Sequence, residues 1–460
     1  MAGGRSVLGV VVAAALLTVG CNPAAQDEPG AASASSSGFS TQLSGTLRTG
    51  GFNPSDEVAR SRSDLATRAV SPVKVSMDTT EFDAQKFAAQ AASGQVPDLL
   101  SVDRTVVGTL ADKGLIRPLE QCFSLHGVRP AQQYYPAAIK DVTYDRHIYG
   151  VPQSFQTSML IGNKRVMAKA GVTAAQLDTS RPDALVGIAR KMYHASNGRP
   201  DVLGLDLDLP GSSAMWLKVF GGAPMDDEGR PTLDDSKNVQ ALTWMKKVMD
   251  AQGGYASIKS FKDSMDVFGD QNQYVTDEVG AQTWGQWYAN VLSNTQDKVS
   301  PVGVPVKSVS GQSIGFAGGT ALVVPKGSRN PSAACSWAIK ATSVDAWVAA
   351  GRARAQKVKA EGAINTGLFT ASPPADRAVR RQFVKSSGNA DFDQLVNASY
   401  TTLENPVSFG GSAAGKAISD ALSNAVSVSL AGEKTPAQAL KDAQADATRA
   451  WQQTAVGKHA

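Results

Sequence analysis

The chain has 460 residues, of which 42% are hydrophobic and 19% charged, and its net charge at neutral pH is +4. This length exceeds what a single hydrophobic core normally serves, so at least two globular parts are expected. The positive charge is spread along the chain without a long basic run, which argues against nucleic acid as a partner.

Residues 1–21 have the composition of a secretory signal peptide. A basic residue precedes an apolar run, residues 7–19, that is too short to span a bilayer as a helix. Residues 17–21 resemble the bacterial lipobox, whose cysteine is lipidated and becomes the mature N-terminus, although Thr18 stands where the lipobox usually has Leu. We expect lipidation at Cys21, which would attach the protein to the outer face of the cell membrane; a plain secreted protein is the alternative.

Residues 22–43 are rich in Ala, Ser, Gly and Pro and poor in large apolar side chains, so they cannot form a core. We expect them to form a flexible tether between the lipid and a globular body.

Residues 44–113 alternate predicted strands with predicted helices. The pattern predicts strands at 44–49, 73–77 and 96–102, and helices that end near residue 69 and span 83–93 and 105–113. This alternation predicts a parallel α/β sheet, in which ligands bind beyond the carboxyl ends of the strands. The residues at those ends include Gly51, Phe52, Asp78, Asp103 and Arg104.

Residues 149–160, YGVPQSFQTSML, predict a turn followed by a half-exposed strand. Pro152 fixes its own backbone and keeps the preceding residue extended. Phe155 and Gln156 stand among hydrogen-bonding side chains, which favours a strand facing a ligand over a core strand. An ordinary loop is the alternative.

Residues 181–295 carry mostly helical patterns, with helices predicted at 184–194, 213–220, 236–252 and 267–278. Trp244 lies within one of them among apolar neighbours and is predicted to belong to the core.

Residues 278–288 place several aromatic side chains in a strand-to-helix turn. Trp284 and Trp287 would form a platform for the apolar face of a ligand, and Gln286 could bind hydroxyl groups. Packing of these rings between helices is the alternative.

The last part of the body begins with predicted strands at 302–306 and 316–325. Helices are then predicted at the following positions: 331–342, 344–352, 376–386, 391–403, 414–431 and 436–451.

The sequence contains one match to an enzyme motif, and its context argues against an enzyme. Residues 311–315 match the G-x-S-x-G pattern of a serine hydrolase, but a strand-like run follows the serine and the only later histidine is His459. No catalytic residue is therefore predicted.

Metal and cofactor sites find no support either. His126, His147 and His194 lack zinc-site spacing, the acidic stretch 226–235 lacks the EF-hand register, and no phosphate-binding glycine loop occurs. We expect neither a metal nor a cofactor.

Four segments together resemble one family: residues 94–103 with 110–119, residues 149–152, residues 318–325 with 330–337, and residues 430–440. Their order is similar to that of the extracellular solute-binding proteins of ABC importers, family 1, which includes maltose-type sugar binders. The resemblance implies an α/β, two-lobe periplasmic-binding-protein-like (type II) fold with a hinge and a cleft between the lobes.

The same resemblance implies the division of the chain. Lobe 1 would hold residues 44–152 and 318–366, and lobe 2 would hold residues 153–317 and 367–455. The chain would cross between the lobes near residue 152 and at residues 313–318 and 367–374.

The resemblance also implies the ligand contacts. They would come from Gly51, Phe52, Asp78, Asp103, Arg104, Phe155, Gln156, Trp216, Trp284, Gln286, Trp287, Gly318, Gly319, Ser408 and Phe409. The expected ligand is a sugar or oligosaccharide, delivered by a monomeric receptor to an ABC permease. A peptide or polyamine ligand, and a sensor that signals to a receptor, are the alternatives.

Two cysteines, Cys122 and Cys335, remain after Cys21, and the resemblance places both in lobe 1. Outside the membrane they could form a disulfide, and two buried free thiols are the alternative.

Overall fold

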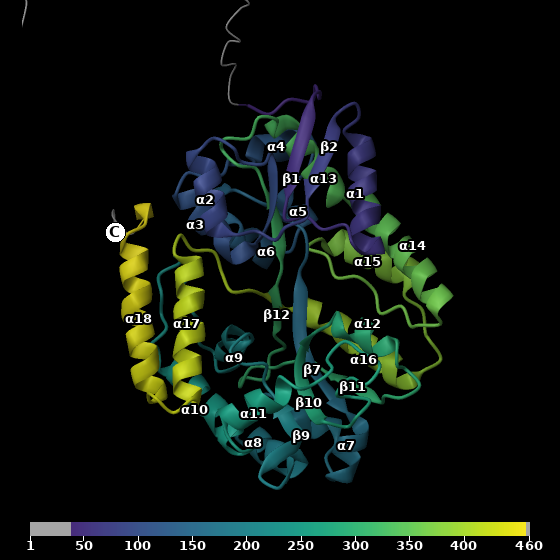
Figure 1. The fold of residues 1–460 in the computed structure, drawn as a ribbon, viewed down its shortest axis with the longest axis vertical. Coiled ribbons are helices and arrows are strands. Elements are labelled where there is room, and N and C mark those ends of the chain that lie inside the picture. The colour runs from purple at the N-terminus through teal and green to yellow at the C-terminus, as the bar shows by residue number, and fades with distance from the viewer. Residues whose placement is uncertain (1–37, 457–460) are drawn as a thin grey trace, which may run out of the picture. The chain divides into compact units, whose positions relative to one another are not determined.

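The structure is a computed structural model that describes residues 38–456. Two β-sheets, each covered by helices, form two lobes (Figure 1). The predicted signal peptide, Cys21 and most of the predicted tether lie outside the described residues, as does His459. Within the described part, no helix combines the length and apolar character needed to cross a membrane.

The first sheet has the strand order β2-β1-β3-β13-β6. β1 pairs in parallel with β2 and β3, and β13 runs antiparallel to β3. The strands are β1 (Thr46–Gly50), β2 (Lys74–Asp78), β3 (Leu99–Asp103), β6 (Val151–Pro152) and β13 (Thr320–Val323). This arrangement confirms the parallel α/β unit predicted for residues 44–113.

Helices cover both faces of the first sheet, with α1 and α14 on one side and α2 and α3 on the other (Figure 1). Asp56 and Asp83 cap α1 and α2, because their side chains accept hydrogen bonds from backbone N–H groups of the first turn. The helical segments are α1 (Glu57–Ala69), α2 (Ala84–Ala92), η1 (Arg104–Val106), α3 (Val107–Asp112), α4 (Glu120–Leu125), α5 (Pro130–Gln133), α6 (Pro136–Asp141), α13 (Pro331–Ala341), α14 (Val344–Glu361) and α15 (Pro373–Phe383). A short hairpin, β4 (Thr143–Tyr144) and β5 (His147–Ile148), precedes β6.

The second sheet has the strand order β14-β12-β7-β10-β9-β8, and β11 also pairs with β7. Its strands are β7 (Gln156–Asn163), β8 (His194–Ser196), β9 (Arg199–Asp206), β10 (Val279–Gly285), β11 (Pro301–Val304), β12 (Gly315–Gly318) and β14 (Pro406–Val407). The helical segments around it are α7 (Lys164–Lys169), η2 (Ala174–Leu177), α8 (Pro182–Met192), α9 (Ser213–Val219), α10 (Ser236–Asp250), α11 (Tyr255–Lys262), α12 (Tyr288–Ser293), α16 (Ala390–Thr401), η3 (Thr402–Glu404), α17 (Gly415–Leu430) and α18 (Pro436–Gln452).

Two adjacent segments carry the chain between the sheets. Residues 153–155 connect β6 to β7, and Gly319 connects β12 to β13. The first segment is hydrogen-bonded to the start of β13, since the backbone N–H of Gln153 donates to the carbonyl of Thr320 over 2.9 Å. Figure 1 shows β7 and β12 running side by side below this junction.

The chain makes its third passage between residues 383 and 390. Residues 367–374, where the sequence predicts a crossing, pair with Ser154 at Thr370 and lead into α15. α15 packs on α14 through Trp347, Ala375 and Val379, so it belongs with the first sheet. The helices of the second sheet resume at α16.

One local prediction for the second lobe is wrong. Residues 267–278 form turns and not a helix, because Asp266 accepts the N–H of Gly269 and Asn272 accepts that of Tyr274, which folds the backbone locally. The helix of this region is α11, at Tyr255–Lys262. The sequence analysis also missed the β8–β9 hairpin, which lies between the helices predicted at 184–194 and 213–220.

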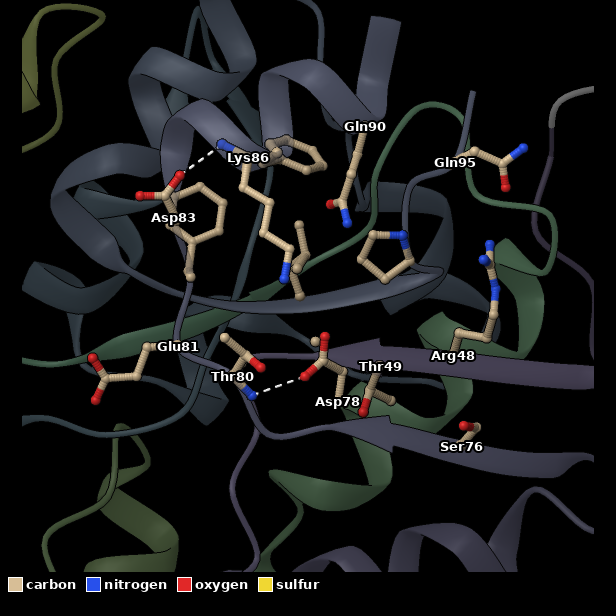
Figure 2. A pocket seen from close by; sticks show the side chains of 16 residues that line it. Arg48, Thr49, Ser76, Asp78, Thr80, Glu81, Asp83, Lys86, Gln90 and Gln95 are labelled. Atoms are coloured by element: carbon tan, nitrogen blue, oxygen red, sulfur yellow. Dashed lines mark hydrogen bonds between the residues drawn. The ribbon is translucent and has the colours of Figure 1, made fainter. Parts of the chain in front are cut away.

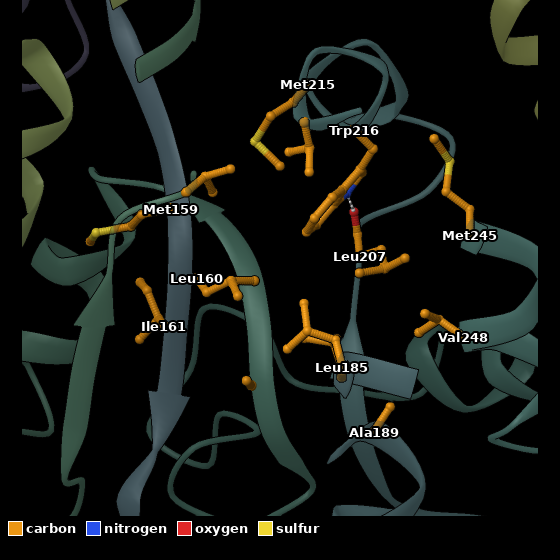
Figure 3. Packing of buried hydrophobic residues seen from close by; sticks show 14 of the residues in the cluster. Met159, Leu160, Ile161, Leu185, Ala189, Leu207, Met215, Trp216, Met245 and Val248 are labelled. Carbon is orange, nitrogen blue, oxygen red and sulfur yellow. Dashed lines mark hydrogen bonds between the residues drawn. The ribbon is translucent and has the colours of Figure 1, made fainter. Parts of the chain in front are cut away.

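One continuous hydrophobic core fills the second lobe. Trp244, predicted as a core residue, is 3% exposed and contacts Trp216, whose ring centroid lies 5.0 Å away. Figure 3 shows the indole of Trp216 above Leu207, to whose carbonyl it donates a hydrogen bond of 2.9 Å.

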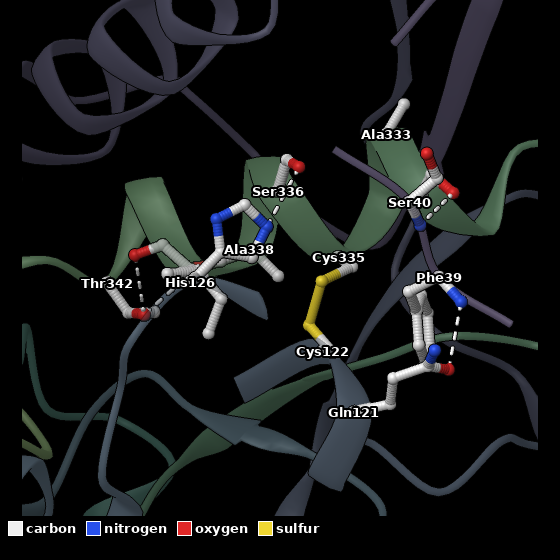
Figure 4. Close-up of a disulfide and its surroundings, with 12 residues drawn as sticks. Phe39, Ser40, Gln121, Cys122, His126, Ala333, Cys335, Ser336, Ala338 and Thr342 are labelled. Carbon is white, nitrogen blue, oxygen red and sulfur yellow. Dashed lines mark hydrogen bonds between the residues drawn. A yellow bond between two sulfur atoms is a disulfide. The ribbon is translucent and has the colours of Figure 1, made fainter. Parts of the chain in front are cut away.

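A disulfide joins Cys122 of α4 to Cys335 of α13, and both residues are buried in the first lobe (Figure 4). Beside it, Gln121 accepts the backbone N–H of Phe39. The bond fastens two parts of the first lobe that are 213 residues apart in the chain.

Candidate functional site

A cavity of about 450 Å³ lies between the two lobes, and we call it the main cavity. Its walls come from α1, α14 and residues 366–369 on one side, from the strand that begins at Gln156 and the turn before α12 on the other, and from the crossing segment that contains Ser154. Three of the predicted ligand residues line it: Gln156, Gln286 and Trp287.

Gln286 follows directly after β10 and is fixed by its backbone, whose N–H donates to the carbonyl of Thr157 over 2.9 Å. Its side chain is 3% exposed, and its Oε1 atom has no hydrogen-bond partner among the described residues. A buried amide oxygen without a partner is costly, and such an atom in a cavity wall can accept a hydrogen bond from a ligand.

The rings of residues 284–288 support one another. Trp284 and Tyr288 stack with centroids 4.2 Å apart and planes 9° apart, and Trp287 meets both of them edge-on. The indole of Trp284 donates to Oε1 of Gln282 over 2.5 Å. Trp284 is thus not one of the residues lining the main cavity; its contacts hold Trp287, which is.

Arg62 of α1 is a cavity residue that the sequence analysis missed. It is 5% exposed, lies 3.8 Å from the ring centroid of Trp347, and donates to Oε1 of Gln153 over 3.0 Å. Burial lowers the pKa of Arg62 to about 9, which leaves the guanidinium charged at neutral pH. It holds the crossing segment through Gln153.

Arg354 of α14 reaches across the main cavity to the second lobe, where its Nη1 donates to Oδ1 of Asn290 over 3.0 Å. Glu57 accepts a hydrogen bond from Arg354 and pairs with Lys357. Burial raises the pKa of Glu57, but the hydrogen bond and the two positive charges outweigh it, so the pKa lies below its usual value. Glu57 therefore stays ionised and positions Arg354 at the cavity.

Five other predicted ligand residues gather at a smaller interlobe cavity of about 160 Å³, which we call the η1 cavity. They are Asp103, Arg104, Gly318, Gly319 and Phe409. Arg104 is 2% exposed and ion-paired with Asp141, and Ser408 donates a hydrogen bond to the same carboxylate. Arg104 and Ser408 therefore bind protein groups.

Gly51 and Asp78 line a third pocket, of about 220 Å³, whose residues all belong to the first lobe. Figure 2 shows Lys86 and Gln90 reaching from α2 toward β1 on one side of it. Asp78 accepts hydrogen bonds from Thr80, which lower its pKa. The structure thus places these two predicted residues away from the main cavity.

Three predicted ligand residues are core residues. Phe52 packs edge-on against Trp337, and Phe155 stacks on Tyr135. Trp216 is fully buried in the second lobe (Figure 3). Their exposed fractions are 5%, 0% and 0%, respectively, so a ligand contact is corrected to a packing role for each.

The described residues contain no cluster of His, Cys, Asp or Glu suited to a metal ion. The main cavity is lined by hydrogen-bonding groups and aromatic rings, which suit a small polar ligand with an apolar face.

Residues 67–351 match the family described as bacterial extracellular solute-binding protein. A maltotriose-binding protein of Pyrococcus abyssi is 24% identical over 151 residues, which are 33% of this chain and 30% of that protein. The match thus spans 30% of the length of this curated relative.

Solved structures extend the comparison to most of the chain. CpMnBP1, solved with mannobiose bound, is 22% identical, with a TM-score of 0.68 over 88% of this chain and 99% of that one. The GacH receptor of Streptomyces glaucescens, solved unliganded and with acarbose, is 19% identical, with a TM-score of 0.66 over 90% and 100%. These similarities confirm the predicted two-lobe fold.

Proposed function

The chain belongs to the bacterial extracellular solute-binding protein family, and from this premise we propose that it captures a sugar or oligosaccharide in its main cavity. The family consists of binding proteins and not of enzymes, and it is extracellular. On this proposal the ligand is bound and released without chemical change.

The observation that carries the proposal is the buried Oε1 of Gln286, an atom in the wall of the main cavity that has no hydrogen-bond partner among residues 38–456. A sugar hydroxyl donating to this atom would supply the missing hydrogen bond. Next to it, the half-buried ring of Trp287 offers an apolar face to the C–H groups of a pyranose. The names of the similar proteins, which refer to maltotriose, mannobiose and acarbose, support the same class of ligand.

The size of the cavity supports the choice of site. Ligand pockets typically measure about 300–1,000 Å³, and the main cavity falls within this range at about 450 Å³. The η1 cavity, at about 160 Å³, falls below it, and its Arg104 is already paired with Asp141.

Hinge motion would admit and enclose the sugar. The lobes are joined by short crossing segments, and they also meet through side-chain contacts that can break, such as Arg354 with Asn290 and Gln296 with the carbonyl of Gly362. Opening would separate these pairs, and closing would bring Gln286 and Trp287 of the second lobe toward α1 and α14 of the first.

A thermal-shift screen against sugars, peptides and polyamines, followed by calorimetry, tests this function. A sugar is expected to raise the melting temperature, because it binds the folded state only. Gln286→Ala should lower the affinity for that sugar by roughly tenfold, the effect of losing one hydrogen bond in a closed site. Gln382→Ala, which removes an exposed glutamine on α15, serves as the matched control. A shift with peptides or polyamines alone would replace the sugar proposal.

We further propose that Cys21 carries a lipid and that the loaded receptor delivers its sugar to an ABC permease. The support is the lipobox-like sequence at residues 17–21 and the tether composition that follows it. Cys21→Ala should move the protein from the detergent-rich phase to the aqueous phase on phase partition. Failure of a deletion strain to take up the identified sugar would support transport, and normal uptake would favour a sensor.

A further inference from the structure

Asp206 is a buried carboxylate in the second lobe that does not line the main cavity. It is the last residue of β9 and is 2% exposed. Its two oxygens pair with the ammonium of Lys262 on α11 over 2.9 and 2.7 Å. Because both groups lose water when they are buried, such a pair is weak evidence for a purely stabilising role.

Gln282 connects this carboxylate to the aromatic rings of residues 284–288. It lies opposite Asp206 in the register of β10 and β9, and its Nε2 donates to Oδ2 of Asp206 over 2.7 Å. An ionised carboxylate only accepts hydrogen bonds, so the amide turns its NH₂ group toward Asp206 and its oxygen away. That oxygen accepts the indole N–H of Trp284 over 2.5 Å. With the amide reversed, two donors would face each other.

A second glutamine extends the chain of hydrogen bonds to Tyr288. Nε2 of Gln273 donates to Oε1 of Gln282 and to the hydroxyl of Tyr288, in both cases over 2.9 Å. The two glutamines are 0% and 3% exposed, so water does not compete for these bonds. The carboxylate of Asp206 therefore sets the orientation of the first amide, and through it that of the second.

Trp287 is held by the two rings that these amides anchor. It meets Trp284 and Tyr288 edge-on, with ring centroids 5.5 and 5.8 Å away. A Cβ atom at Gly285 would lie 2.4 Å from Nε1 of Trp287, so the glycine allows the indole to fold back against the end of β10. The position of this cavity-lining ring thus depends on contacts with its own lobe.

We propose that Asp206 and Lys262 are positioning residues for the sugar site. The carboxylate orients Gln282, the amide fixes Trp284, and the ring contacts hold Trp287 where a pyranose can stack on it. This inference rests on the sugar-binding function proposed above. It adds an ion pair outside the cavity that determines the affinity within it.

Calorimetric titration of the full chain with mannobiose, with maltotriose and with the best sugar of the thermal-shift screen tests the inference. Asp206→Asn keeps the shape of the side chain but removes its charge and one acceptor oxygen. We expect the affinity for the sugar that binds to fall roughly tenfold, because the supports of the stacking ring lose their fixed orientation.

A double-mutant cycle with Trp287→Ala separates positioning from general destabilisation. In the Trp287→Ala background, Asp206→Asn should change the affinity by less than about twofold, because the ring through which Asp206 acts is absent. The same loss in both backgrounds would overturn the inference, and so would an unchanged affinity in Asp206→Asn alone.

Lys262 provides a second test that leaves the buried residues intact, since its side chain is 26% exposed. Lys262→Met should lower the affinity by about threefold or more, and Lys262→Arg, which retains the ion pair, should restore it. This comparison decides the matter if Asp206→Asn does not fold. Equal affinities of the Met and Arg variants overturn the inference.

Asp391→Asn is the matched control. Asp391 on α16 pairs with Lys164 in the same lobe and does not line the main cavity, so its loss should leave the sugar affinity unchanged. A drop in affinity equal to that of Asp206→Asn would overturn the inference. Binding of no sugar by the unaltered chain would instead overturn the sugar-binding function itself.

Discussion

Nε of Arg104 donates to Oδ2 of Asp141 over 2.9 Å, and both side chains are buried. Arg104 also donates to the carbonyl groups of Ser154, in one segment that connects the lobes, and of Ala317, in β12 of the second sheet. Its backbone N–H donates to the carbonyl of Gly319, the other connecting segment. Ser408 donates to the other oxygen of Asp141 over 2.5 Å. Through these bonds the ion pair connects the first lobe to both crossing segments and to Ser408, the residue directly after β14.

Arg104→Ala is expected to lower the free energy of unfolding by about 3–5 kcal/mol, because it leaves the Asp141 carboxylate buried without its counter-charge. Urea denaturation followed by circular dichroism measures the change. The double variant Arg104→Met with Asp141→Leu removes both charges and should recover much of the loss. A variant of Arg104 that keeps its stability but loses sugar binding would restore this residue as a ligand contact.

Truncation of Trp216 should mainly reduce stability, whereas truncation of Trp287 should mainly reduce sugar affinity. Trp216→Ala should cost about 3–5 kcal/mol of stability, because it leaves a cavity in the core of the second lobe. Trp287→Ala removes a half-buried ring that packs edge-on against Trp284 and Tyr288, and should lower the free energy of unfolding by about 1–2 kcal/mol, less than Trp216→Ala. It should weaken sugar binding by roughly tenfold, the equivalent of about 1.4 kcal/mol. Calorimetry and thermal melting of both variants provide the comparison.

Asp376 should make stability depend on pH. Burial raises its pKa to about 7, although hydrogen bonds from Thr370 and Tyr135 act in the opposite direction. An unfolded Asp has a pKa of about 3.9, so between about pH 4 and pH 7 the folded state holds a proton that the unfolded state has released. The contribution of Asp376 to the free energy of unfolding is thus highest below about pH 4, and it falls by about 1.4 kcal/mol per pH unit up to about pH 7.

Asp376→Asn should remove this part of the pH dependence, because the amide stays neutral throughout. Free energies of unfolding for both proteins at pH 4, 5.5, 7 and 8 (roughly spanning the two pKa values) would show it as a difference that grows up to pH 7 and then stays constant. Parallel profiles for the two proteins would contradict the assignment.

Loss of the disulfide should destabilise the protein without affecting the sugar site. Cys122→Ala with Cys335→Ala frees a long loop in the unfolded chain and should cost roughly 2–5 kcal/mol. Both cysteines lie in the first lobe and neither lines the main cavity, so sugar affinity should be retained. Mass spectrometry after alkylation, with and without reductant, establishes the bond. Two alkylated cysteines in the unreduced protein would contradict it.

Local signals in the sequence were sufficient for the first sheet but not for parts of the second lobe. Asp56 and Asp83 mark helix starts between apolar runs, and the strands and helices follow as predicted. Residues 267–278 have a helix-like apolar pattern, yet hydrogen bonds from side chains such as Asp266 and Asn272 fold them into turns. That competition is decided by the surrounding packing, which the pattern does not contain.

The site residues in a turn were predicted from the sequence, whereas the site residues within helices were not. Gln286 and Trp287 follow a strand end, where an unusual run of polar and aromatic residues is visible in the sequence. Arg62 and Arg354 lie within α1 and α14, where an arginine has the same appearance as one on a solvated face. The fold alone brings these two side chains to the cavity, and it turns Trp216 inward.

The position of the disulfide has a consequence for the order in which the protein is made. Residues 153–318, which include most of the second sheet, lie between Cys122 and Cys335 in the chain. The disulfide of the first lobe therefore cannot form until the inserted part of the second lobe has been synthesised. Once the bond has formed, the covalent ring includes that insertion, but both cysteines lie in the first lobe. Oxidation would therefore stabilise the protein without linking one lobe covalently to the other, and the lobes could still rotate.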